Sequence, residues 1–200
     1  MDRSHHFGHD AVPGVSAHTE TLLRQALGER IRPIVAIDQL DRGFLELQLD
    51  WESMYTQFVR HVADVNAVIS PYHDDAMGDL RVRPEDGTVG FSAGPAGWAF
   101  TIPMFGRMYA KKFGVPEDKM TRRLWGDHFF NPEERRWSTQ GEPSHRAFNL
   151  FVADPIGKVF SACMNGQVGT RHGRFIAIQA RARSLAPARA KHSHTLTHGL

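Results

Sequence analysis

The fold is decided by one short stretch, Arg32-Pro-Ile-Val-Ala-Ile-Asp-Gln-Leu-Asp-Arg42. Its apolar run, Ile34–Ile37, is too short for a helix and predicts a strand buried on both faces, as in parallel α/β sheets. Asp38 and Asp41 follow at the carboxyl end of this strand, where open parallel sheets bind their ligands. An Asp after a strand more often caps a helix or a turn, so its position alone does not establish a site.

Helical patterns lie on both sides of this strand. Thr19 can cap a helix that ends at Arg30. Asp50 can cap a longer helix over Trp51–Ile69, in which apolar residues recur every three or four positions. A second short strand is expected at Thr88–Phe91. This order of helices and apolar strands indicates an α/β fold.

The second half of the chain is punctuated by turns. A Gly/Ser loop, Ser92–Gly97, leads to a helix that Thr101 can cap, and this arrangement places backbone N–H groups near a ligand site, although most such loops are only turns. We expect a small β-element around Trp125–Pro132 and a strand at Arg146–Ala153. A helix should begin at Asp154-Pro155 and run to Asn165, because proline is tolerated in the first helical turn.

The two ends of the chain differ from its centre. Met1–Gly8 shows no period of either kind, and no acidic residue follows Asp154. The basic stretch 166–200 is predicted to be disordered; its charge suits non-specific contact with RNA, but it lacks interleaved aromatic residues and any RNA-binding motif. Clustered histidines at both ends are more often incidental than metal ligands; they are His5, His6, His9, His192, His194 and His198.

Composition indicates a soluble protein of a reducing compartment. The chain has 200 residues, a formal net charge of +2 and one cysteine, so it forms no internal disulfide. No apolar run approaches the ~20 residues of a membrane span, and Met1–Pro13 has no apolar core for a signal peptide. We therefore expect a cytoplasmic location and no membrane partner.

A series of short matches resembles one family, the translational GTPase elongation factor 2. They begin with Asp10…Gly14-Val15…Thr19-Glu-Thr21…Leu23-Arg-Gln-Ala26…Glu29-Arg-Ile31…Pro33, Asp41-Arg42 and Leu45-Glu-Leu-Gln-Leu49. They are strongest at Gly87-Thr-Val-Gly-Phe91 and Gly97-Trp-Ala-Phe100, and continue with Leu124-Trp-Gly-Asp127 and Asp154-Pro-Ile156…Lys158-Val-Phe160…Met164-Asn165. Together they cover the chain from about Asp10 to Asn165.

The resemblance implies a partial P-loop-GTPase-type parallel sheet at 10–95, without its phosphate-loop half. Part of an α+β inserted subdomain would follow at 96–165, and the basic tail lies outside the match. The family's guanine-recognition motif, Asn-Lys-x-Asp, falls on Asp38, Gln39, Leu40 and Asp41; its second base-contacting loop falls on Ala93, Gly94 and Pro95. The implied ligand is GTP with magnesium, and the implied partner is the ribosome during translocation.

Departures from the family pattern weaken these expectations. Asp38 replaces an amide that can donate to guanine, Gln39 replaces a lysine, and Pro95 lacks an N–H. No Gly-x-x-x-x-Gly-Lys-[Ser/Thr] phosphate loop occurs in the sequence, and no magnesium ligand is identified in it. We therefore expect negligible GTP binding and hydrolysis by this chain. A non-enzymatic piece that contacts the ribosome or a factor, and a relative among spliceosomal or ribosome-maturation GTPases, remain alternatives.

The resemblance also implies a weakness in the sheet. In the family, the neighbours of the strand Ile34–Ile37 come largely from a segment that precedes the match at Asp10. We therefore expect open edges on this strand, a tendency to aggregate and fast amide exchange.

Overall fold

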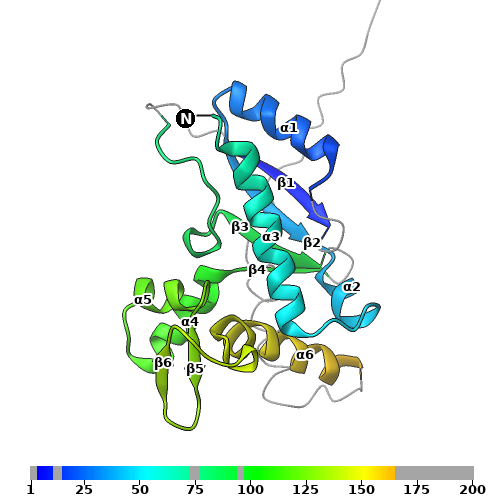
Figure 1. The fold of residues 1–200 in the computed structure, drawn as a ribbon. Coiled ribbons are helices and arrows are strands. Elements are labelled where there is room, and N and C mark those ends of the chain that lie inside the picture. The colour runs from blue at the N-terminus through cyan, green and yellow to red at the C-terminus, as the bar shows by residue number, and fades with distance from the viewer. Residues whose placement is uncertain (1–3, 11–14, 73–76, 94–96, 165–200) are drawn as a thin grey trace, which may run out of the picture. The chain divides into compact units, whose positions relative to one another are not determined.

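The computed structural model describes residues 4–10, 15–72, 77–93 and 97–164, and it has a mixed α/β fold. The chain divides into two compact units, Met1–Pro155 and Ile156–Leu200. Within the described part of the second unit, Ile156–Met164 forms most of helix α6, which begins at Asp154. All other elements belong to the first unit. Figure 1 labels the helices and strands along the chain.

A four-stranded sheet, ordered β1-β2-β3-β4, is the centre of the first unit. Its strands are β1 (Ser4–Asp10), β2 (Arg32–Asp38), β3 (Val89–Ala93) and β4 (Trp98–Thr101). The first three are parallel and β4 is antiparallel to β3. The remaining strands, β5 (Phe129–Asn131) and β6 (Arg136–Ser138), form a separate hairpin. This hairpin confirms the β-element expected around Trp125–Pro132.

Strand β1 corrects two expectations about the N-terminal segment. The sequence of Met1–Gly8 shows no period, yet Ser4–Asp10 pairs with β2 along its whole length, from Ser4 opposite Arg32 to Asp10 opposite Asp38. β2 therefore has β1 on one side and β3 on the other, and the expected open edges are wrong. Pairing between backbones needs no apolar alternation, so a strand rich in His and Gly leaves no hydrophobic signal.

Strand β2 is also less buried than its apolar sequence predicts. Val35 and Ile37 have 1% and 0% of their surface exposed, whereas Ile34 and Ala36 on the other face are only half-buried. Helix α3 (Trp51–Ile69) packs on the buried face, where the rings of Phe58 and Phe91 lie 5.3 Å apart (Figure 1). The expectation of burial on both faces is therefore wrong for this strand, whose side chains alternate instead.

Side-chain caps begin two of the helices, α3 and α1. α3 begins where predicted, because Asp50 accepts a hydrogen bond from the backbone N–H of Ser53 at 2.9 Å. α1 (Ala17–Gly28) is capped by Ser16, not by Thr19, which lies buried inside its first turn. Thr101 precedes α4 (Ile102–Phe113) without a side-chain cap. Helix α2 (Leu40–Leu45) follows β2.

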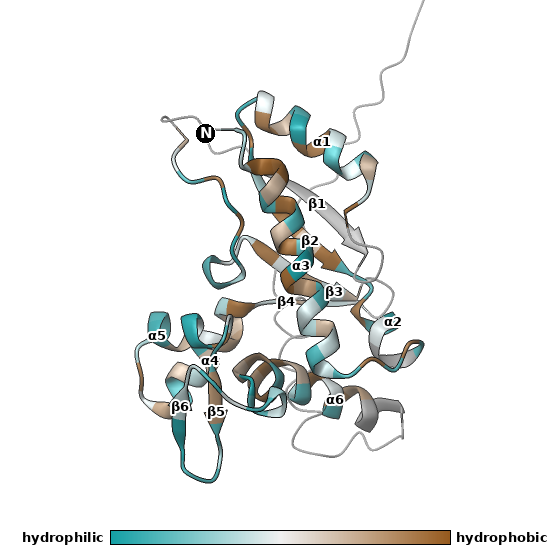
Figure 2. Ribbon diagram, in the orientation of Figure 1, coloured by the Kyte–Doolittle hydropathy of each residue, from teal (hydrophilic) through white to brown (hydrophobic). Residues whose placement is uncertain are grey.

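The region after α4 packs through aromatic and aliphatic side chains. Figure 2 shows hydrophobic residues along β5 and hydrophilic ones along β6. The region contains α5 (Glu117–Arg123), the β5–β6 hairpin, two short helical turns, η2 (Pro143–His145) and η3 (Asn149–Ala153), and the start of α6. A third short turn, η1 (Pro84–Asp86), precedes β3. The strand predicted at Arg146–Ala153 is wrong, since η3 runs directly into α6 (Asp154–Met164). The buried apolar residues of this stretch, Ala147, Phe148, Val152 and Ala153, follow a helical and not an alternating pattern.

Candidate functional site

The candidate base-recognition segment lies at the carboxyl end of β2, where the chain turns into α2. Gln39 adopts a left-handed conformation, with φ 60° and ψ 35°, and its carbonyl accepts a hydrogen bond from the N–H of Arg42 at 3.1 Å. The turn places Leu40 in the core, with 1% of its surface exposed, and leaves Asp41 half-buried in the first turn of α2. Asp41 therefore lies in the helix that follows β2, with its side chain still partly open to solvent.

Asp38 is held by the neighbouring strand. The hydroxyl of Ser92 donates a hydrogen bond to Asp38 Oδ1 at 2.7 Å, and both side chains are half-buried. The two residues are 54 positions apart in the sequence, so only the parallel pairing of β2 and β3 brings them together. The bond joins the carboxyl ends of two strands at the edge where α/β sheets place their ligands. The sequence placed Ser92 in a loop and gave no indication of this contact.

The second candidate loop is described only at its first residue. Ala93 ends β3, is completely buried and pairs with Trp98 of β4, so its side chain belongs to the core. Gly94 and Pro95 lie outside the described residues. Helix α2 contacts β3, and Ser92 of β3 bonds Asp38, so the segment Asp38–Asp41 and the end of β3 are neighbours.

A second polar cluster, which sequence reasoning missed, surrounds Arg146. Its guanidinium bonds Glu52 Oε1 and Oε2 at 2.8 to 3.0 Å, and Asp127 Oδ1 at 3.0 Å. The side-chain amide of Asn149 also donates to Glu52 Oε2 at 2.8 Å. The guanidinium carbon lies 4.4 Å from the centre of the Tyr55 ring. The cluster thereby joins α3 to the segment after α5 and to the start of η3.

The environment of this cluster keeps Arg146 charged. Burial lowers the pKa of its guanidinium, but the hydrogen bonds that it donates to Glu52 and Asp127 raise this pKa by more, so the pKa lies above its ordinary value. Burial raises the pKa of Tyr55, whose hydroxyl accepts a hydrogen bond from the N–H of Gly126 at 2.9 Å. The cluster therefore links α3 to the segments around Asp127 and Arg146 through charged hydrogen bonds.

The described residues give no indication of a metal centre. Within residues 4–10, 15–72, 77–93 and 97–164, no three His, Cys, Asp or Glu side chains are grouped to hold an ion. His5, His6 and His9 belong to β1, while His192, His194 and His198 lie outside the described residues. Over that same part of the chain, no helix combines the length and apolarity that crossing a membrane requires. No protein-family model matches the sequence.

Proposed function

We propose that the chain carries the guanine-recognition segment of an elongation factor 2-like translational GTPase, and that it acts in protein synthesis on the ribosome. The observation that carries this proposal is the position of Asp38–Asp41, at the carboxyl edge of a parallel sheet and beside the end of β3. Motifs that read a guanine base occupy this edge because side chains after adjacent parallel strands converge there.

Asp41 is the base-reading residue in this proposal. Its carboxylate would accept two hydrogen bonds, one from the ring N–H of guanine and one from the exocyclic amine. Adenine has neither donor on that edge and would leave the carboxylate unpaired, at a cost of about 1–3 kcal/mol. Asp41 is half-buried at the start of α2, where a base could reach it.

Asp38 makes this site a weak one. Its carboxylate accepts a hydrogen bond from Ser92 and cannot donate to the acceptors of guanine, whereas an amide could do both. An asparagine at this position would keep the Ser92 bond through its oxygen and gain a donor for guanine. We therefore expect Asp38→Asn with Gln39→Lys to strengthen base binding without disturbing the ends of the strands.

The experiment titrates the full chain with guanosine, inosine and adenosine, and follows backbone amide shifts by NMR. Nucleosides test base recognition separately from phosphate binding. Inosine lacks only the exocyclic amine of guanosine, so it isolates one of the two bonds to Asp41. In the Asp38→Asn/Gln39→Lys variant, guanosine should bind about tenfold more tightly than inosine, with shifts at the end of β2.

A third substitution supplies the control. Adding Asp41→Asn should abolish the preference for guanosine, while exchange of exposed Glu46, also next to α2, for glutamine should leave it unchanged. Equal binding of the three nucleosides by the double variant would contradict the proposal. So would a preference for guanosine that survives the loss of the Asp41 carboxylate.

A second candidate function is that of a non-enzymatic piece that contacts the ribosome or a factor. The hydrogen bond from Ser92 to Asp38 favours it, because this bond already engages a carboxylate of the proposed base site. Co-sedimentation with ribosomes, with and without GTP, distinguishes the two functions. Binding that GTP strengthens supports nucleotide-linked action, and binding that ignores GTP supports the second candidate. Association with spliceosomal or pre-ribosomal particles instead would point to a GTPase relative of those assemblies.

A further inference from the structure

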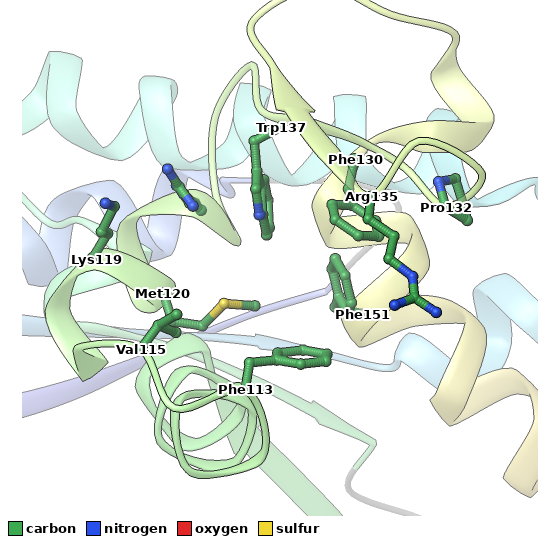
Figure 3. Close-up of a pocket in the computed structure, with 10 residues that line it drawn as sticks. Phe113, Val115, Lys119, Met120, Phe130, Pro132, Arg135, Trp137 and Phe151 are labelled. Atoms are coloured by element: carbon green, nitrogen blue, oxygen red, sulfur yellow. The ribbon is translucent and has the colours of Figure 1, made fainter.

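A pocket of about 570 Å³ opens between the end of α4, helix α5, the β5–β6 hairpin and η3, far along the sequence from Asp38–Asp41. This volume is in the range of sites that hold small organic ligands. Figure 3 shows the side chains of Phe113, Met120, Phe130, Trp137 and Phe151 converging on the space. All the lining residues lie within the first unit, Met1–Pro155.

The wall of the pocket is a group of packed rings. Trp137 and Phe151 are stacked, with ring centres 5.7 Å apart and planes inclined by 22°. Phe130 contacts both, at 5.1 Å from Trp137 and 5.4 Å from Phe151. Phe113, at the end of α4, keeps 49% of its surface exposed. A flat apolar group entering the pocket would therefore meet ring faces that solvent still reaches.

The charges at this pocket are all positive. Lys119, Arg123 and Arg135 are among its lining residues, which include no acidic side chain. Arg123 lies over the Trp137 ring, 4.8 Å from its centre, so its guanidinium is held at the aromatic wall. Over the described part of the chain, no salt bridge joins these three cations to a carboxylate. The segment after Asp154 contains no Asp or Glu, so its side chains supply no complementary anion.

We propose that this pocket binds a small aromatic anion, a planar ring that carries a phosphate or carboxylate. The ring would pack against Phe113, which lines the pocket and keeps about half of its surface exposed, while the anionic group would bind Arg123, Arg135 and Lys119. Guanidinium groups form paired hydrogen bonds with phosphate and carboxylate oxygens and also stack on rings, so one residue serves both parts of the ligand. The site is separate from the segment Asp38–Asp41 and does not depend on the function proposed for it.

The test uses 1-naphthyl phosphate as probe, with the full chain, isothermal titration calorimetry and NMR of the tryptophan indole N–H signals. We expect saturable binding that shifts the signal of Trp137. Removing either half of the ligand should weaken binding at least about tenfold, so 1-naphthol and inorganic phosphate serve as the two comparisons. Adenosine monophosphate and phenyl phosphate then show whether a nucleotide or a simple aromatic phosphate is preferred.

Paired variants locate the site. Arg135→Gln with Lys119→Gln should weaken binding of 1-naphthyl phosphate at least about tenfold. Arg136→Gln is the matched control, because Arg136 neighbours Arg135 on the exposed hairpin but does not line the pocket; it should change affinity less than about twofold. These residues are exposed, so the substitutions leave the core intact, and circular dichroism verifies folding.

Three results would overturn the proposal. The first is absence of saturable 1-naphthyl phosphate binding by the folded wild-type chain. The second is equal weakening by Arg136→Gln and by the Arg135→Gln/Lys119→Gln variant. The third is equal affinity for 1-naphthol, which would show that the cations contribute nothing.

Discussion

Replacing Arg146 by methionine should lower the free energy of unfolding by about 3 kcal/mol. Methionine keeps an apolar contact with Tyr55 and removes the charge and all the donors. The Arg146 side chain is 11% exposed and its partner Glu52 is 27% exposed, so the pair is largely removed from water. Breaking such a pair by deleting one partner costs roughly 3–5 kcal/mol when both are fully buried.

Exposure of the two carboxylates reduces that figure. Glu52 keeps its hydrogen bond from Asn149 and can regain water at its exposed edge, which favours the lower end of the range. The Asp127 side chain is 83% exposed, so losing its contact adds only about 0–1 kcal/mol. The expected loss is therefore about 3 kcal/mol, most of it from the bonds to Glu52.

Urea denaturation followed by tryptophan fluorescence measures this loss. Arg122→Met is the matched control, since Arg122 and its partner Asp118 are 72% and 76% exposed; its cost should stay below about 0.5 kcal/mol. Adding Glu52→Gln to Arg146→Met should recover part of the stability by removing the unpaired carboxylate. A loss from Arg146→Met no larger than that of the control would refute the reasoning, because it would show that the cluster is not formed in solution.

Three further predictions test the packing, the pH response and the sheet. Gly106→Ala should lower the thermal midpoint and cost about 2 kcal/mol, because its Cβ would lie 2.9 Å from the Thr121 Cβ; Gly28→Ala, with no atom within 4 Å, should not. Burial lowers the pKa of His61 below 6.5, so as pH falls His61 takes up its proton more readily in the unfolded protein than in the folded one. The free energy of unfolding should therefore be highest above pH 6.5 and fall as the pH falls below it. His61→Leu should flatten this pH dependence in urea titrations, and an unchanged slope would show that another group causes it. The amide of Val35, in β2, donates to the carbonyl of Thr88 at 3.0 Å, and β2 has a strand on each side. This amide should therefore exchange slowly with solvent, and fast exchange would show that the sheet opens.

The sequence by itself determined the elements whose signals are local. The cap of Asp50 and the apolar period of Trp51–Ile69 placed α3 correctly, because capping and helical burial repeat within a few residues. It also placed β2, with Asp38–Asp41 at its carboxyl end, since a short apolar run ending in Asp is visible without any partner. The proposed reading of that segment as a guanine motif rests on resemblance and stays a prediction.

Tertiary structure alone decided the elements and contacts that depend on distant partners. β1 forms through backbone pairing with β2, and the short apolar run at Arg146–Ala153 became helical because its neighbours bury a helical face. The bond from Ser92 to Asp38 spans 54 positions, and that from Arg146 to Glu52 spans 94. Hydrogen bonds and ion pairs act over a few ångströms in space whatever the separation along the chain, so these contacts appear only once the fold has brought the residues together.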